Sequence, residues 1–357
     1  MDCPSPLAYN AKDMENKPLN RSLGAARATK QDEFYTQLSD IEKELRHYTK
    51  HFKGKTVLCN CDDPRVSNFF HFFSHSFEKL KLKKLITTCY KNQDTDLFST
   101  HKAEKGAYLE YEGDKNRNRV PDPAEIGVHN FKGDGDFRSK ECIALLKQAD
   151  IVVTNPPFSL FREYVAQLVK FEKKFLIIGN TNALTYKDIF QLIKEDKIRT
   201  GYTNFNVGMF FGVPDDWEHF HHADKDGKKI ARVAASCWFT NIEVAKHKEY
   251  LPLFKKYNSK EYPSYDNYNA IEVSRYTDIP ADYDGAMGVP ITFVDKYNPD
   301  QFEILGITDR GNEWGLKTKE YTREDVPNPG DLNRRAAIKI GNTYKPTYAR
   351  LLIRRRT

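Results

Sequence analysis

Residues 151–158 read Ile151-Val152-Val153-Thr154-Asn155-Pro156-Pro157-Phe158, an apolar run followed by an amide, a diproline and an aromatic ring. An uninterrupted apolar run is typical of a strand that is buried on both faces of a sheet. Proline fixes its own φ and restricts the residue before it, so the chain should leave this strand in one defined direction. We therefore predict a buried strand with Asn155 at its end.

The four residues at this strand end, Asn155, Pro156, Pro157 and Phe158, are suited to holding a flat nitrogenous base by its amino group. An exocyclic amine on adenine or cytosine is a poor nucleophile, because its lone pair is delocalised into the ring. Two acceptors aimed at the amine hydrogens would correct this, and the Asn155 side-chain oxygen and the Pro156 carbonyl can supply them. Phe158 can stack on an extruded base. The pattern indicates methyl transfer from a sulfonium donor, and an ordinary Asn-Pro turn is the alternative.

The neighbouring segments alternate between strand and helix patterns. Apolar runs predict strands at 56–61, 84–90, 150–155 and 174–180. Helical spacing lies between them, with expected N-caps that include Ser39 and Thr185. This alternation predicts an α/β fold with a mainly parallel sheet covered on both faces. Residues 208–212 and 232–241 are expected to form an antiparallel hairpin that completes the sheet.

Ligands of such sheets bind at the carboxyl ends of the strands, and polar residues follow several of these ends. The candidates are Asp62, Asp63, Cys89, Tyr90, Asp134, Asp136 and Phe137. Carboxylates here suit the ribose hydroxyls, the ammonium group or the adenine amino group of a nucleoside cofactor, and Phe137 could flank its ring. Each acid alone could be a turn or N-cap residue. Their convergence with Asn155 favours a binding site.

The first predicted strand is not followed by a glycine-rich loop. No glycine occurs between Lys55 and Lys105, so nothing there would let the backbone approach a pyrophosphate. A nicotinamide dehydrogenase is therefore disfavoured. A cofactor without phosphates, such as S-adenosylmethionine, does not need that approach.

Composition bounds the class of protein. A chain of 357 residues can hold a main domain and a smaller one. No run approaches the length of a membrane span, and the first 30 residues lack the apolar core of a signal peptide, so we expect a soluble protein of the cytoplasm. The six cysteines lie mostly in apolar runs that suit reduced core thiols. Neither they nor the His-rich residues 219–222 have zinc-ligand spacing, and no metal is expected.

We expect a flexible tail at 1–30, a catalytic domain at 31–244 and a target-recognition region at 245–357. Residues 331–357 carry eight basic residues and one acidic residue of a chain whose net charge is +6. Such an end is typical of an element that contacts phosphates, and a solvated charged terminus is the alternative. The candidate nucleic-acid contacts are Arg310, Asn312, Trp314, Arg334, Arg335, Arg354 and Arg355.

Several long motifs resemble those of the EcoRI-type adenine-specific DNA methyltransferases. They are residues 32–37, 60–70, 133–138, 154–161, 174–178 and 283–293. The resemblance covers roughly residues 30–310 and implies a Rossmann-like, S-adenosylmethionine-dependent methyltransferase fold. It further implies methylation of the exocyclic nitrogen of an adenine flipped out of double-stranded DNA. A cognate restriction endonuclease would be a partner, and a monomer suffices to modify one strand at a time.

The resemblance also implies roles for single residues. Tyr35 and Thr36 would cap the methionine end of the cofactor, and Asp62 or Asp63 would bind it. Cys89 and Tyr90 would border its ribose and adenine, and the motif of Asp134, Asp136 and Phe137 would meet the adenine ring. Asn155, Pro156 and Phe158 would be the catalytic motif. Phe210 or Phe211 could support the flipped base from its other side, or both could be buried sheet aromatics.

Two other functions stay open on the sequence. An Asn-Pro-Pro motif can hold any planar amide or amine, so the substrate could be RNA or a protein glutamine. The chain could also be a DNA-binding module that has lost catalysis, which the intact motif argues against.

Overall fold

The computed structural model describes residues 35–60, 67–89, 106–118, 120–122, 124–213, 215, 217–218, 220–309 and 316–356. The expected tail at 1–30 lies outside these ranges, as do Asp62, Asp63, Tyr90, Arg310, Asn312 and Trp314. Within the ranges, none of the helices combines the length and the apolarity that crossing a bilayer requires.

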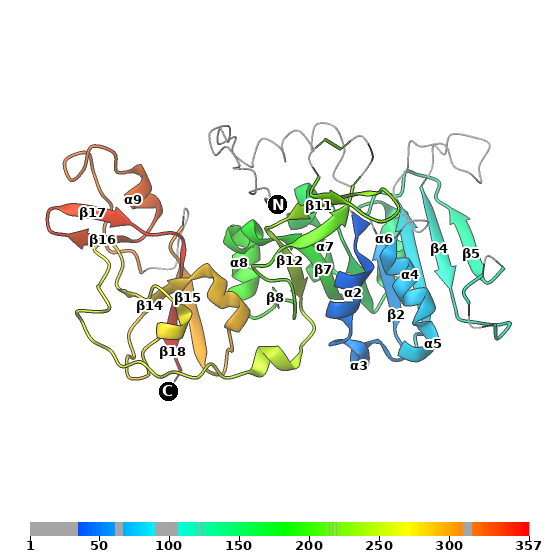
Figure 1. Cartoon of the computed structure of the whole chain (residues 1–357), viewed down its shortest axis with the longest axis horizontal. Helices are drawn as coiled ribbons and strands as arrows, with labels where there is room; N and C mark the ends of the chain where they lie inside the picture. Colours follow the sequence, from blue (N-terminus) through cyan, green and yellow to red (C-terminus); the bar gives the residue numbers. More distant parts are fainter. Residues whose placement is uncertain are drawn as a thin grey trace, which may run out of the picture.

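An eight-stranded sheet is the centre of the larger part of the molecule, with the order β5-β4-β3-β2-β6-β7-β12-β8 (Figure 1). The strands are β2 (Thr56–Asn60), β3 (Lys84–Cys89), β4 (Ala107–Tyr111), β5 (Ile126–Asn130), β6 (Ile151–Thr154), β7 (Lys174–Asn180), β8 (Arg199–Thr200) and β12 (Ser236–Thr240). β2 pairs in parallel with β3 and β6, and β6 pairs in parallel with β7. The outer strands pair antiparallel. The predicted α/β class and its four parallel strands are confirmed.

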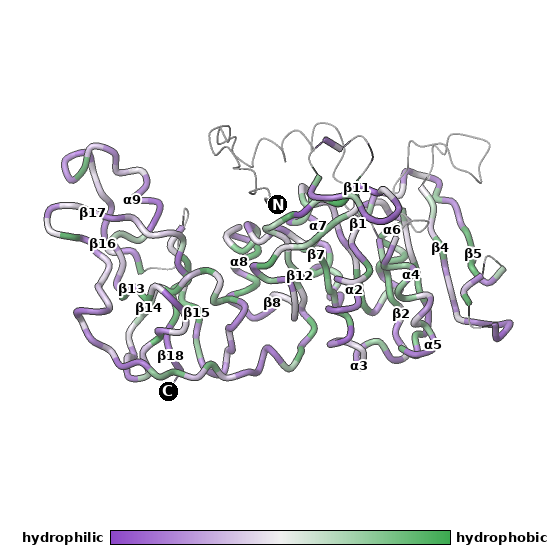
Figure 2. The backbone as a smooth tube through the Cα atoms, viewed as in Figure 1, coloured by the Kyte–Doolittle hydropathy of each residue, from purple (hydrophilic) through white to green (hydrophobic). Residues whose placement is uncertain are grey.

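Successive residues of the central strands pack in two hydrophobic cores, one on each face of the sheet. Val57 and Val153 belong to the core that α2, α4 and α5 complete. Leu58 and Val152 belong to the core of α6, α7 and α8. The helices are α2 (Leu38–Leu45), α3 (Thr49–Phe52), α4 (Asn68–His75), α5 (Phe77–Leu80), α6 (Lys140–Gln148), α7 (Phe161–Lys170) and α8 (Lys187–Lys194). Because strand side chains alternate between faces, a sheet covered on both sides requires strands that are apolar throughout; Figure 2 shows hydrophobic stretches in the body of the sheet and hydrophilic ones in the outer loops.

The helices predicted between the strands are present, but the residues predicted to cap them are not the N-caps. Ser67 and Ser139 cap α4 and α6 by accepting from Phe70 N and Cys142 N. The predicted caps at Ser39 and Thr185 are wrong. α2 begins at Leu38, two residues before the start that a Ser39 cap implies, because the carbonyl of Gln37 accepts from Asp40 N and Ile41 N directly after a strand. Thr185 ends the 3-10 helix η2 (Thr181–Thr185), and α8 starts at Lys187.

The predicted antiparallel hairpin is confirmed only in part: Met209 and Phe210 pair antiparallel with Val233 and Arg232, but this pairing lies outside the main sheet. A separate four-stranded sheet has the order β1-β9-β11-β10 and comprises β1 (Tyr35–Thr36), β9 (Met209–Gly212), β10 (His222–Ala223) and β11 (Lys229–Val233). β12 instead pairs with β7 and β8 in the main sheet. The burial explains the split. β12 is buried at every residue, which suits an inner strand, whereas β9 buries alternate residues and suits a sheet with one open face.

The chain after η3 (Ala245–Lys248) forms a second, smaller part beside the sheet (Figure 1). Its elements are β13 (Ile271–Glu272), β14 (Met287–Pro290), η5 (Ile291–Lys296), β15 (Phe302–Ile307), α9 (Gly330–Arg334), β16 (Ala337–Ile340), β17 (Thr343–Pro346) and β18 (Arg350–Arg355). One sheet has the order β13-β14-β18-β15, and β16 pairs only with β17. Within the basic end of the chain, β18 is therefore an inner strand, and its residues 351–353 are fully buried.

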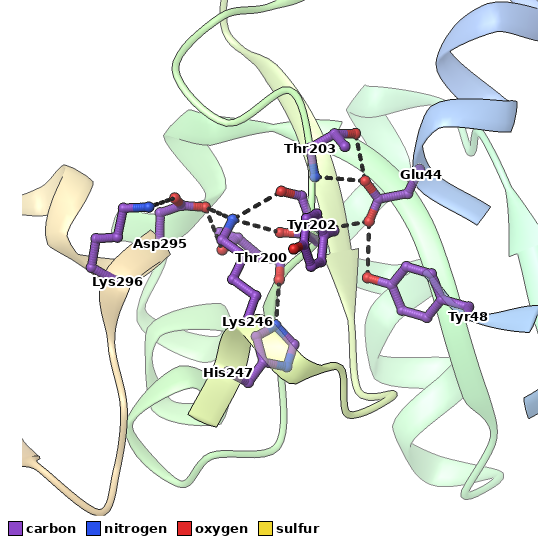
Figure 3. Close-up of polar contacts among 10 residues, drawn as sticks. Glu44, Tyr48, Thr200, Tyr202, Thr203, Lys246, His247, Asp295 and Lys296 are labelled. Atoms are coloured by element: carbon purple, nitrogen blue, oxygen red, sulfur yellow. Dashed lines mark hydrogen bonds and ion pairs between the residues drawn. The ribbon is translucent and has the colours of Figure 1, made fainter. Parts of the chain in front are cut away.

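A polar network joins the two parts (Figure 3). Lys246, which follows the main sheet, forms an ion pair with Asp295 of the smaller part. The same ammonium group donates to the carbonyls of Gly201 and Tyr202 at 3.1 Å, and Thr200 Oγ1 donates to Asp295 at 3.3 Å. The contacts hold η5 against the edge strand β8.

The other half of this network is built on Glu44 of α2 (Figure 3), which is fully buried. Its carboxyl group accepts from Tyr202 N at 2.5 Å, from Thr203 N at 2.6 Å and from the Tyr48 hydroxyl at 2.9 Å. Burial raises the pKa of this carboxyl group above its usual value, and the hydrogen bonds oppose that rise. Glu44 thereby ties the residues after β8 to the helical layer.

Candidate active site

The carboxyl ends of β2 and β6 meet at the point where the order of the parallel strands reverses. The chain goes from β2 outward to β3 and returns on the other side of β2 as β6. Ligands of open α/β sheets bind in the crevice at such a switch point. Asn60 ends β2 and Thr154 ends β6, so Asn155 follows directly at the crevice. Its position was predicted.

A buried clamp fixes these two strand ends to each other. Thr154 Oγ1 donates to the carbonyl oxygen of Asn60, and the Tyr164 hydroxyl donates to the Asn60 side-chain oxygen. Asn60 is 4% exposed, and Thr154 and Tyr164 are fully buried. A polar residue in an otherwise apolar strand was a signal for Asn60. No sequence pattern could show its bond to Tyr164, which is 104 residues away.

The predicted catalytic motif continues through the 3-10 helix η1 (Phe158–Leu160) into α7, which holds the loop that contains Phe137. The Tyr164 ring meets the Phe137 ring edge-on, with 5.1 Å between centroids. Gln167 Nε2 donates to Phe137 O at 3.0 Å, and Arg138 reaches Glu163 at 3.0 Å. The helix that follows Asn155 therefore positions the predicted cofactor loop.

This loop packs closely on the end of β3. Gly135 has φ +80°, and a Cβ there would lie 2.5 Å from the carbonyl oxygen of Cys89. Glycine is required because a side chain would meet rigid backbone. The structure thus brings the backbones of Gly135 and Cys89 together, and Asp134 and Asp136 flank that contact in the chain.

Asp136 has a partner of its own. Its oxygens accept from Arg138 Nε at 2.9 Å and Nη2 at 2.7 Å, and this bonding lowers the pKa of the carboxyl group below its usual value. Asp134 accepts from Asp136 N at 3.1 Å and is half-buried. Asp136 is therefore held ionised. The ring of the next residue, Phe137, is buried and only 6% exposed.

The strand of Tyr35 and Thr36 lies beside the predicted catalytic motif. Thr36 pairs with Phe211 of β9, and the Phe211 ring meets the Phe158 ring edge-on at 6.4 Å. Asn68, at the start of α4, donates to Thr36 O at 2.7 Å. The Thr36 hydroxyl is buried and has no hydrogen-bond partner among the described residues, which suits a polar ligand.

Of the two candidate aromatics on β9, Phe211 contacts Phe158 of the predicted catalytic motif and is fully buried. Phe210 faces the other side of the strand, where its ring lies 5.3 Å from the ring of His221. The alternation along a strand separates the two rings in this way.

The predicted DNA contacts that the structure describes are engaged within the smaller part. Arg334 lies 3.3 Å from Asp309, and Arg335 forms an ion pair with the same carboxylate. Arg354 reaches Glu303 at 2.8 Å, and Arg355 reaches Asp284 at 3.8 Å. These four arginines lie on α9, on the residue that follows α9, and on β18. The structure therefore does not gather them with Asn155 at the crevice.

A family model described as "Adenine-specific methyltransferase EcoRI" matches residues 22–356. The chain is 50% identical over 298 residues to the type II methyltransferase M.EcoRI of Escherichia coli, covering 82% of this chain and 90% of that protein. It is 39% identical over 288 residues to M.MgeORF184P of Mycoplasma genitalium, covering 78% and 84%. It is 37% identical over 329 residues to M.MpnI of Mycoplasma pneumoniae, covering 88% and 96%. Comparison with solved structures gives no match.

Proposed function

We propose, because this chain belongs to the EcoRI-type adenine-specific methyltransferase family, that Asn155 and Pro156 hold the amino group of the target adenine. Membership makes the chain an adenine-specific DNA methyltransferase of the restriction–modification type. The observation that carries the proposal is the position of Asn155 at the switch point, directly after the clamped end of β6.

The chemistry at this position follows from the acceptors. The Asn155 side-chain oxygen and the Pro156 carbonyl accept the two amine hydrogens, which returns lone-pair density to the nitrogen that attacks. Pro156 is buried and Phe158 is half-buried, so Phe158 can stack on a base that has left the duplex. No strong base is needed, because positive charge develops on the nitrogen only as the new bond forms.

The methyl donor of the proposal is S-adenosylmethionine, which supplies an electrophilic methyl group when it is bound. The buried Thr36 hydroxyl and the close backbone approach at Gly135 support the fit. Tyr35, Thr36, Cys89, Asp134 and Phe137 would line the site in a Rossmann-like methyltransferase fold. The predicted cofactor-binding residues also include Asp62, Asp63, Tyr90 and the ion-paired Asp136.

The proposed substrate is double-stranded DNA, which the region 245–357 would recognise. The enzyme would act as a monomer in the cytoplasm, with a cognate restriction endonuclease as partner in the same system. The ion pair of Lys246 and Asp295 supports a fixed placement of this region against the sheet.

A labelling experiment tests the proposal. Protein with a tritiated methyl donor is incubated with separate pools of DNA, RNA and protein, and we expect label in DNA alone. Asn155→Ala should lower turnover by about 10²–10³-fold, as the loss of a preorganised hydrogen-bonding group does. Donor affinity, measured by calorimetry, should stay unchanged, and Asn118→Ala on an exposed loop is the control. Turnover by Asn155→Ala at the rate of the parent, or label in RNA or protein, would refute the assignment.

A further inference from the structure

The hairpin of β16 and β17 is a two-stranded ribbon, separate from the three larger sheets of the described residues. Ile340 pairs with Thr343, so Gly341 and Asn342 form a two-residue turn, and Gly341 has the positive φ of +58° that such turns use. In Figure 1 the ribbon (red, upper left) lies on the same side of the view as β11 and the upper end of the main sheet. We propose that this ribbon enters the major groove of the DNA substrate.

The base of the ribbon is rigidly mounted. Asn267 is fully buried, and its side chain accepts from Ala337 N at 2.8 Å. The same amide donates to Leu332 O at 3.0 Å and to Arg335 O at 2.8 Å. Ile338 packs against a small hydrophobic core. A groove-reading element needs a fixed stem of this kind, because side chains must be presented in a constant register.

The outer end of the ribbon is exposed. Ile340 is 57% exposed, and Lys339, Asn342, Thr343 and Lys345 are exposed as well. A large aliphatic side chain at a hairpin tip gains no burial in the free protein. In the major groove it can contact a thymine methyl group, and an asparagine can bond an adenine edge.

The ribbon also carries cations that are available to phosphates. Within the described ranges, Lys339 and Lys345 form no ion pair with a carboxylate. Arg334, Arg335 and Arg354, in contrast, are paired with acids of their own region. Phosphate contacts provide most of the salt-dependent affinity for DNA, so we assign this role to the two lysines.

A pair of tyrosine rings in edge-on contact supports the lysine positions. The Tyr344 ring packs against the Tyr321 ring with centroids 5.0 Å apart. The ammonium group of Lys339 lies 5.7 Å from the Tyr344 ring centroid, and that of Lys319 lies 5.2 Å from it.

Paired strands are about 4.8 Å apart, so two of them with their side chains fit a major groove about 12 Å wide, which admits a two-stranded ribbon.

The inference rests on the proposed DNA substrate, and the test separates the two. Sites that the parent protein methylates are first mapped by sequencing modified bases, and a duplex with one site then serves for binding titrations at several salt concentrations. Lys339→Gln/Lys345→Gln should reduce the slope of log affinity against log salt by about 0.9 per lysine. The matched control is Lys50→Gln/Lys53→Gln, which removes the same charge at the opposite end of the sheet, around α3.

A second variant tests base contact. Asn342→Ala should lower the ratio of affinities for the mapped site and an unrelated duplex by about fivefold or more. Melting temperature and donor affinity should match those of the parent. The proposed role of the ribbon would be overturned if the lysine variant keeps the salt slope of the parent and Asn342→Ala keeps its ratio of affinities. It would also be overturned if Lys50→Gln/Lys53→Gln reduces the salt slope as much as the lysine variant does. Absence of DNA methylation by the parent would overturn the proposed function and the ribbon with it.

Discussion

At the end of β2, one amino acid connects the two halves of the candidate site. Asn60 accepts from Thr154 through its carbonyl and from Tyr164 through its side chain. Both donors are fully buried, so the oxygen atoms have no water to replace a lost partner. A buried acceptor left without its donor costs more than the hydrogen bond itself contributes.

Tyr164→Phe should therefore destabilise the protein while the ring stays against Phe137. We expect the free energy of unfolding to fall by about 1–3 kcal/mol, measured by denaturant titration. Turnover should fall with it, since α7, which follows the Asn155 segment, loses its tie to the end of β2. Tyr250→Phe, at a tyrosine that is 66% exposed, is the control. Equal stability of Tyr164→Phe and the parent would contradict the clamp.

His247 predicts a dependence of stability on pH. It is 5% exposed and lies 3.0 Å from Thr200 O through Nε2. Burial above all, together with the charges of Arg199 and Lys246, lowers its pKa to about 4, although the bond to Thr200 and the charge of Asp196 act to raise it. The folded state thus favours the neutral ring, so its contribution is present above the ordinary pKa of about 6.5 and is lost as pH falls towards 4.

We expect this loss to amount to about 3 kcal/mol between pH 7 and pH 4. Denaturant titrations of the parent and of His247→Gln at several pH values measure it. The variant should lose less stability on acidification, because glutamine keeps a donor and does not titrate. His222→Gln, on an exposed strand, should follow the parent. Identical pH profiles for His247→Gln and the parent would show that this ring is not the titrating group.

At the scale of elements, the sequence predicts the parallel strands well and the edges poorly. β2 and β6 are buried throughout and apolar at their inner residues because both faces are covered, and this pattern is visible locally. β4 and β5 are mostly half-buried or exposed, so no apolar run indicates them. The pairing of β9 with β1, over 170 residues away in the chain, depends on tertiary contacts that no local pattern contains.

The same limit applies to the candidate site. Asn155 and the Gly135 loop are visible in the sequence because turn chemistry and strand ends have local signals. Tyr164 and Gln167 look like ordinary positions of an amphipathic helix. Their contacts with Asn60 and Phe137 arise only when α7 packs on the sheet.

The loop before α6 gives a prediction for one element. Gly135→Ala should meet the Cys89 carbonyl and adopt an unfavourable φ, and we expect a loss of about 1–3 kcal/mol in stability and weaker donor binding. Gly227→Ala separates the causes, because Gly227 has the same φ of +80° but nothing within 4 Å. Calorimetry and thermal melting measure both variants. A Gly135→Ala protein that behaves like Gly227→Ala would show that the close approach is unimportant.

At the scale of the whole molecule, the joint in Figure 3 sets the position of the smaller part. The side chains of Lys246 and Asp295 are 9% and 13% exposed. Asp295→Ala would leave a nearly buried ammonium group with only the Gly201 and Tyr202 carbonyls. We expect a loss of about 3 kcal/mol in stability, at the lower end for a broken buried pair.

The functional consequence is specific to DNA. Asp295→Ala should reduce the efficiency of DNA methylation more than it reduces donor affinity, which kinetics and calorimetry compare. Glu243→Ala removes the exposed pair with Lys248, whose side chain is 68% exposed, and should change stability by at most about 1 kcal/mol. Equal effects of the two variants would contradict a structural role for the joint.

The most direct measurement is modified-base sequencing of DNA from cells that express the parent chain or Asn155→Ala. We predict adenine methylated on its exocyclic nitrogen at one recurring sequence with the parent, and only a small fraction of those sites methylated with the variant. Methylation with Asn155→Ala at the level of the parent, or no methylated adenine with the parent, would contradict this prediction.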